Sequence, residues 1–266
     1  MFAERVPHAA VRPLLTRNYV GFSQPAGTAV RWLSPPTGTA TVILNIGAPF
    51  GGQPLAFAAG LTDRHEIIDQ SGAIDCVDLK LTPLGAYTLL GTRMDDLTDV
   101  SVDLTDLLGA PAERLTEQLV AASDWVARFD LLDAFLADRA ERGRRPAPEV
   151  SWVWQRLTGS AGLVPVGELA AEVGWSRRHL VARFREQVGL PPKTMARICR
   201  FTRLTRLATS GGPARWAELA AECGYYDQAH MNRDFREFAG ITPTEFLARL
   251  TPTEVTSVQY PWVAAS

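Results

Sequence analysis

Side chains that can recognise DNA bases recur in two short segments of the sequence, SRRHLVAR at 176–183 and DQAHMNR at 227–233. Arg, Asn and Gln form paired hydrogen bonds with purine edges in the major groove, and small apolar side chains contact the thymine methyl group. The same residue types also cover the solvated faces of ordinary helices. The surrounding sequence has to distinguish these two interpretations.

Each segment follows a nearly identical stretch, GELAAEVGW at 167–175 and AELAAECGY at 217–225. With one inserted residue the match continues to the end of the segment, and it aligns Ser176 with Asp227, Phe184 with Phe235, Gly189 with Gly240, and Pro192 with Pro243. A chance similarity between two helices would not also align the glycines and prolines that end them. The sequence therefore contains a duplicated unit.

Each copy has the parts of a helix-turn-helix. ELAAE predicts a short helix, and Gly174 or Gly224 follows where the chain turns at positive φ. Ser176 and Asp227 are predicted to cap the next helix through their side-chain oxygens. That second helix places apolar side chains at positions i, i+4 and i+8: Leu180, Phe184 and Val188 in the first copy, and Met231, Phe235 and Ala239 in the second.

The face opposite this apolar stripe follows from a rotation of about 100° per residue. In the first copy it carries Arg177, Arg178, Val181, Ala182 and Arg185, next to the cap Ser176. In the second copy it carries Gln228, Ala229, Asn232, Arg233 and Arg236. Because such a face occurs in both copies, base recognition is favoured over the alternative that both faces are merely solvated.

The segment between the copies, MARICRFTRLTRLATSGG at 195–212, predicts one long helix with an arginine at every third position. A step of three drifts by about 60° per repeat, so these arginines cannot all lie on one face. Some are expected to contact phosphates and others to pair with neighbouring glutamates. The candidates for phosphate contact are Lys193, Arg197 and Arg200.

The overall net charge of −2 conceals a difference between the two halves of the chain. Residues 1–147 contain 13 Lys and Arg against 18 Asp and Glu, a net charge of −5, whereas residues 148–250 contain 14 against 10, a net charge of +4. The basic half is the candidate for binding a polyanion. A surplus of four charges is modest and does not by itself establish such a partner.

The first 110 residues contain short segments typical of strands, separated by Pro and Gly: 28–33, 39–47, 54–60 and 73–82. This pattern predicts a β-rich sandwich or barrel. Two stretches, 83–91 and 96–109, predict short helices or capped turns instead. From Pro111 the apolar spacing becomes helical, with Leu115, Leu119, Ala122, Val126, Phe129, Leu132, Phe135 and Leu136 on the predicted apolar face of one or two helices.

Residues 163–249 resemble the DNA-binding domain of AraC/XylS-type transcriptional regulators. The resemblance rests on two helix-turn-helix units in order, joined by a long helix, and on the ending GITPTEF at 240–246. It implies a sequence-specific transcription regulator that binds double-stranded DNA, with recognition helices at 176–187 and 227–238. It implies groove-facing positions at Arg178, Val181 and Ala182 in the first helix and at Gln228, His230, Asn232 and Arg233 in the second. His179 and His230 are also interpreted as packing or phosphate-contacting residues.

The resemblance further implies a β-rich, cupin-like N-terminal domain that senses a small-molecule effector, forms a homodimer, or does both. The expected fold is therefore α+β with two domains. We expect a sensing or dimerisation domain at 1–140 that includes a helical extension, a linker at 141–148, the double helix-turn-helix domain at 149–250, and a tail at 251–266. The linker ERGRRPAP is charged and lacks an apolar anchor, as exposed linkers do.

Three other classes of protein fit parts of the sequence. A cupin-like metal-dependent enzyme with a helical appendage needs clustered ligands, but the N-terminal half has only His8 and His65, and His65 is interpreted as a surface turn residue. An alkyl-transfer repair regulator needs several reactive cysteines, which Cys76 alone does not supply. An interaction module would use the basic helices to bind an acidic partner or the chain's own acidic half. We expect no catalytic residues, no metal and no cofactor.

The sequence contains no apolar run of 18 residues or more, and its N-terminus lacks the pattern of a secretory signal. We therefore expect a cytoplasmic protein that does not bind membranes.

Overall fold

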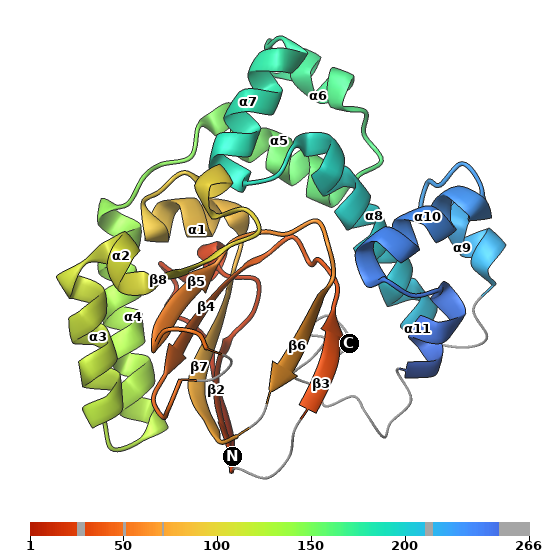
Figure 1. Cartoon of the computed structure of the whole chain (residues 1–266). Coiled ribbons are helices and arrows are strands. Elements are labelled where there is room, and N and C mark those ends of the chain that lie inside the picture. The colour runs from red at the N-terminus through yellow and green to blue at the C-terminus, as the bar shows by residue number, and fades with distance from the viewer. Residues whose placement is uncertain (26–29, 50–51, 71, 211–214, 250–266) are drawn as a thin grey trace.

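The computed structural model describes residues 1–25, 30–49, 52–70, 72–210 and 215–249. A sheet-bearing N-terminal region is followed by a helical C-terminal region (Figure 1). This order confirms the predicted α+β fold. The predicted tail at 251–266 lies outside the described residues.

Six antiparallel strands form the main sheet in the order β1, β2, β7, β4, β5, β8. Their bounds are Phe2–Arg5 (β1), Tyr19–Gln24 (β2), Ile74–Leu81 (β7), Ala40–Asn45 (β4), Ala56–Ala59 (β5) and Ser101–Asp103 (β8). A separate antiparallel ribbon pairs β3 (Val30–Ser34) with β6 (Glu66–Gln70). The long strand β7 lies between β2 and β4, with Val77 opposite Gly21 on one side and Leu44 on the other.

The sequence pattern located β3, β4, β5 and β7 but missed four strands. β1 is an edge strand of four residues in which exposed and half-buried side chains alternate, and β6 has charged residues within it. β2 contains Gly21 at its centre, a residue that normally weakens a strand. β8 is three residues long and lies inside the segment predicted as helices or turns; that segment also contains α2 (Leu104–Leu108).

Helices α1 (Pro83–Leu90), α2, α3 (Ala110–Ala121) and α4 (Trp125–Arg142) pack their apolar faces against the main sheet (Figure 1). The prediction that Ala122 and Val126 belong to the buried face is wrong for Val126, which is 67% exposed. The chain leaves the helix at Ala122, and Asp124 then caps α4 by accepting a hydrogen bond from the Ala127 N–H at 2.9 Å. The start of α4 still contacts the sheet through Trp125, since a Cβ on Gly21 of β2 would lie 2.4 Å from the Trp125 ring.

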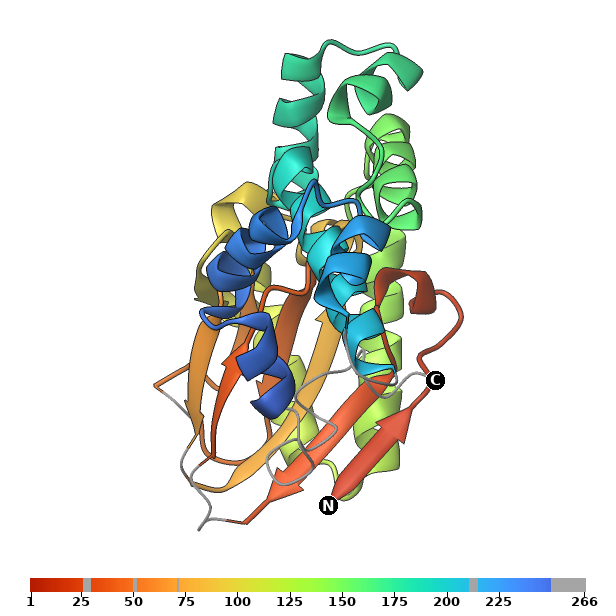
Figure 2. The same cartoon turned by 90° about the vertical axis from the view of Figure 1, so that its right-hand side faces the viewer.

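Seven helices are described in the C-terminal region: α5 (Pro148–Gly159), α6 (Val166–Glu172), α7 (Arg177–Val188), α8 (Pro192–Thr209), α9 (Trp216–Glu222), α10 (Gln228–Ala239) and α11 (Pro243–Arg249). The α6–α7 pair lies near the start of α8 and the α9–α10 pair lies beside its length (Figures 1 and 2), with Phe201 of α8 in contact with Phe235 of α10. The long helix therefore joins two compact units, as predicted.

The predicted linker contains the break between α4 and α5. Arg144 and Arg145 are exposed there, but the Ala147 N–H donates to the buried Gln187 Oε1 at 2.9 Å. The end of this segment is thus fixed to α7.

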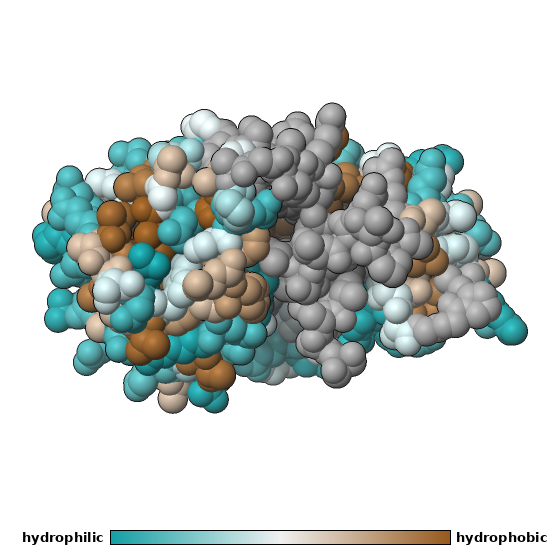
Figure 3. All heavy atoms as spheres, turned by 90° about the horizontal axis from the view of Figure 1, so that it is seen from below, coloured by the Kyte–Doolittle hydropathy of each residue, from teal (hydrophilic) through white to brown (hydrophobic). Residues whose placement is uncertain are grey.

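Seen from below, the described surface mixes hydrophilic and hydrophobic residues (Figure 3). No helix among the described residues has both the length and the apolar character needed to cross a membrane.

Candidate nucleic-acid interface

The turns of the two helix-turn-helix units have the same backbone conformation and equivalent hydrogen bonds. Gly174 and Gly224 have φ of 68° and 73°. The next residue in each copy donates its N–H five residues back, from Trp175 to the Ala170 carbonyl and from Tyr225 to the Ala220 carbonyl, both at 2.9 Å. The duplicated sequence therefore encodes duplicated backbone geometry, as predicted from the glycines.

Both recognition helices begin at the predicted caps. The Ser176 side chain accepts a hydrogen bond from the His179 N–H at 3.2 Å, and the Asp227 side chain accepts one from the His230 N–H at 2.6 Å. The rings of His179 and His230 contact Trp175 and Tyr225 edge-on, with centroids 4.5 Å and 5.4 Å apart. The two histidines occupy equivalent positions and support the turn in both copies.

The predicted apolar stripes are buried. Leu180, Phe184 and Val188 of α7 and Met231, Phe235 and Ala239 of α10 have no exposed surface. The opposite faces are accessible: Arg177, Arg178, Val181, Ala182 and Arg185 are exposed on α7, and Gln228, Ala229, Arg233 and Arg236 on α10, with Asn232 half-buried. His230 is half-buried on the flank of α10.

The arginines on these two faces carry positive charge that the described structure leaves uncompensated. Within the described residues, Arg177, Arg178, Arg185, Arg233 and Arg236 make no ion pair. By contrast, Arg183 of α7 pairs with Glu186 at 2.6 Å. The unpaired guanidiniums lie where a polyanion would approach.

A pocket of about 230 Å³ borders one flank of α10. Three of the predicted residues line it together with four residues from the start of α9 and the start of α11: Gln228, Asn232 and Arg236, then Trp216, Thr242, Pro243 and Thr244. The Asn232 Oδ1 is buried there without a hydrogen-bond partner. Helical spacing alone placed the α10 residues on an open face, because it carries no information about how α9 and α11 approach.

The arginines of α8 divide as the three-residue spacing requires. Arg197 donates to Asp234 Oδ1 at 2.7 Å and 3.1 Å and to both carboxylate oxygens of Glu237. The hydrogen bonds from Arg197 lower the pKa of the Glu237 carboxyl. Arg200 donates to the Gly162 carbonyl at 3.0 Å, and its guanidinium lies over the Tyr225 ring. Lys193 is exposed at the start of the helix.

A protein-family model described as a helix-turn-helix domain matches residues 169–249. The match spans both units, whose turns and caps repeat each other. The C-terminal region is an AraC-type helix-turn-helix domain. The protein is accordingly a DNA-binding transcription regulator, and nothing supports the enzyme alternative.

Several solved structures resemble parts of the chain. An AraC-type transcriptional regulator from Chromobacterium violaceum is 22% identical, with a TM-score of 0.35 over 40% of this chain and 95% of its own. The C-terminal domain of AraT, a response regulator from Geobacillus stearothermophilus, is 17% identical, with a TM-score of 0.37 over 42% and 94%. ToxT from Vibrio cholerae is 10% identical, with a TM-score of 0.44 over 88% and 98%.

No curated protein shows significant sequence similarity to this chain.

The described residues outside the AraC-type domain present no metal-binding cluster of three or more His, Cys, Asp or Glu side chains. His65 lies in the loop before β6, as predicted for a turn residue, but it is half-buried against Gly240 of the AraC-type domain and not free on the surface. Burial raises the pKa of the Cys76 thiol to about 12 and that of the Cys199 thiol to about 11, so both stay protonated at neutral pH. Neither is an activated nucleophile.

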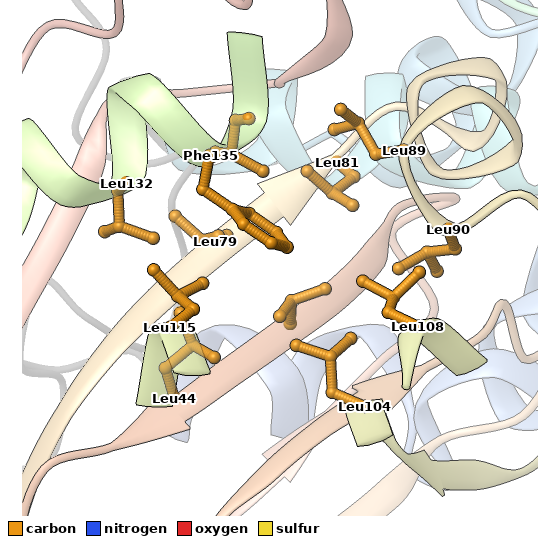
Figure 4. A pocket seen from close by; sticks show the side chains of 12 residues that line it. Leu44, Leu79, Leu81, Leu89, Leu90, Leu104, Leu108, Leu115, Leu132 and Phe135 are labelled. Atoms are coloured by element: carbon orange, nitrogen blue, oxygen red, sulfur yellow. The ribbon is translucent and has the colours of Figure 1, made fainter. Parts of the chain in front are cut away.

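A small apolar cavity of about 20 Å³ lies between the main sheet and helices α1 to α4 (Figure 4). Its lining is entirely Val, Leu and Phe: Val42, Leu44, Leu79, Leu81, Leu89, Leu90, Leu104, Leu108, Leu115, Leu132, Phe135 and Leu136. This volume is close to that of one water-sized probe, and its walls offer no polar partner. A small-molecule effector would fit here only after the lining helices separated.

Proposed function

We propose that this regulator recognises a specific DNA sequence by placing α7 and α10 in adjacent major-groove segments. The repetition of the same exposed face, turn and cap in both units carries this proposal. Adjacent groove segments on one face of DNA lie about 34 Å apart. The connecting helix α8 packs against both units and joins them in one framework, which restricts how far apart α7 and α10 can lie.

The exposed side chains have different expected roles. Arg178 and Arg233 lie on the faces opposite the buried stripes, where an inserted helix meets base edges. Arg236 borders the pocket on the flank of α10, where the wall of the groove places sugar and phosphate. Lys193 is exposed at the start of α8 and remains a phosphate-contact candidate.

Arg197 and Arg200 are excluded from the proposed contacts, because carboxylates of α10 and a carbonyl already engage their guanidiniums. They support the units instead.

Arginine variants test this division of roles. Arg178→Ala and Arg233→Ala should each weaken binding to the operator by about 1 to 3 kcal/mol while changing binding to scrambled DNA much less. Arg236→Ala and Lys193→Ala should weaken binding to both DNAs alike and lower the slope of log K against log salt by about 1 each. Fluorescence anisotropy with DNA from upstream of the protein's own gene measures all four.

Arg114→Ala is the matched control, since this exposed arginine lies on α3, outside the AraC-type domain. If Arg178→Ala and Arg233→Ala weaken binding to scrambled DNA as much as to the operator, the two side chains contact phosphates and not bases.

A further inference from the structure

Both recognition helices end at a glycine that touches the N-terminal region. Gly189 follows α7 with φ of 102°, and Gly240 follows α10 with φ of 67°. The Thr98 Oγ1 donates to the Gly189 carbonyl at 3.0 Å, and a Cβ on Gly189 would lie 3.2 Å from the Met94 carbonyl oxygen. At the other unit, a Cβ on Gly240 would lie 2.6 Å from His65 Nε2. The N-terminal region therefore contacts the same point of each unit.

His65 and Thr98 belong to two segments that are hydrogen-bonded to each other. The Asp99 N–H donates to the Leu61 carbonyl at 3.1 Å, and the Gly60 N–H donates to the Val100 carbonyl at 3.2 Å. Arg64 adds an ion pair with Asp99 at 3.9 Å. We call these two segments, residues 60–65 and 94–100, the brace. One local structure thus touches the ends of both recognition helices.

The brace is anchored in the core and does not lie loosely on the surface. Leu61, Met94 and Leu97 are buried in the hydrophobic core, and a Cβ on Gly60 would lie 1.8 Å from the Leu97 carbonyl oxygen. Gly189 is buried where it meets the brace. A displacement of the α7 end therefore disturbs a segment that is anchored in the core of the N-terminal region.

The contact leaves the DNA-facing side chains free. Arg178 and Arg233 are exposed, and the contacts of the brace with Gly189 and Gly240 lie at the C-terminal ends of α7 and α10. The brace therefore affects how α7 and α10 are placed relative to each other. It does not block access to their DNA-facing sides. Holding two binding elements at the spacing of their sites lowers the entropic cost of engaging both.

We propose that the brace fixes the separation of α7 and α10 and so determines which spacing of DNA half-sites the protein accepts. His65 and Thr98 are then positioning residues for recognition, although neither reads DNA. The inference rests on the proposed function, in which both helices bind one duplex. One inserted base pair moves a half-site by about 3.4 Å along the DNA and rotates it by about 34°.

Half-site insertions test the inference with the full chain. Footprinting on the upstream DNA locates the two half-sites, and anisotropy then compares the natural spacing with one and two inserted base pairs. The wild-type protein should lose roughly tenfold in affinity per inserted pair, and the His65→Ala/Thr98→Val double variant less than threefold, because only α8 then restrains the relative placement of its two helices. Both proteins should bind an isolated half-site equally.

Matched variants separate positioning from damage to the fold. His8→Ala/Thr105→Val changes the same residue types at exposed sites outside the brace and should keep the wild-type spacing penalty. Thr98→Ser retains the donor to Gly189 and should also behave as wild type, and thermal unfolding monitors folding of each variant. Thr98→Val alone, which keeps the side-chain shape, should show an intermediate penalty.

A double variant that is folded yet loses affinity on insertion as steeply as the wild type would overturn the inference. If the wild-type protein binds upstream and scrambled DNA equally, the proposed function itself fails, which is a different result.

Discussion

Among the described residues, Arg197 makes the most hydrogen bonds to carboxylates, and its role is structural. It pairs with Asp234, whose side chain is 3% exposed, and with the half-exposed Glu237. A buried carboxylate that loses its partner is strongly destabilising, more so than an exposed ion pair. The contact joins α8 to α10 and thereby supports the second recognition helix on its buried side.

Arg197→Met should destabilise the chain by about 3 kcal/mol at pH 7, because it leaves the Asp234 charge buried and unpaired. Urea unfolding followed by circular dichroism measures the loss. Arg206→Met on the same helix is the control, since Arg206 is exposed and should change stability by less than about 0.5 kcal/mol. Equal stabilities of the two variants would contradict the structural role.

The same pair predicts a pH dependence with a definite sign. Hydrogen bonds from Arg197 lower the pKa of Glu237 in the folded state below its usual value of 4.5. The stability that this pairing contributes is therefore fully present above pH 4.5 and is lost as the pH falls through the lowered pKa. The difference in free energy of unfolding between the wild type and Arg197→Met should therefore become smaller as the pH falls through that range.

At the scale of residues, the sequence predicted features that depend on local hydrogen bonds. It did not predict contacts between side chains that are far apart in the chain. Caps and turn glycines follow from short-range hydrogen bonds, so Ser176 and Asp227 were identified. The partners of Arg197 lie 37 and 40 positions away on another helix, a distance over which helical spacing says nothing. For the same reason His65 looked like a loop residue, although it packs on Gly240.

At the scale of elements, the two turns should respond differently to the same substitution. Gly174→Ala should cost about 1 kcal/mol, since its Cβ would meet open space and only the positive φ is strained. Gly224→Ala should cost up to about 1 kcal/mol more, because its Cβ would lie 2.2 Å from Leu163 Cδ2, the end of a half-exposed side chain that must rotate away. Urea unfolding of both variants tests the difference.

Leu163→Ala is the control background for this comparison. It removes the clash, so Gly224→Ala should then cost about as much as Gly174→Ala. A Gly224→Ala penalty that persists in full without Leu163 would show that the strain arises elsewhere.

Element prediction was more complete in the C-terminal half than in the sheet. The helices repeat a strong local pattern of breakers and buried residues, and both recognition helices begin at a side-chain cap and end at a glycine. The edge strands β1 and β8 pair on one side only and are short, so they need little apolar alternation. Their existence depends on neighbours far away in the chain, which a local pattern does not contain.

At the scale of the whole molecule, the AraC-type domain presents two basic faces, on α7 and α10. The N-terminal region contacts the C-terminal ends of these two helices. The rival interpretation, in which the basic helices dock on the chain's own acidic half, predicts that these faces are covered. Arg178 and Arg233 are exposed, and the described contacts at the two helix ends are made by the neutral residues Thr98 and Gly189 and by His65 and Gly240. The arrangement favours binding of an external polyanion.

The most direct test of this account is the affinity of the full chain for its own upstream DNA and for a scrambled duplex, measured by anisotropy over a range of salt concentrations. We predict upstream binding at least about 10³-fold tighter at physiological salt, with both affinities falling as salt increases. Equal affinities with equal salt slopes would contradict sequence recognition by α7 and α10.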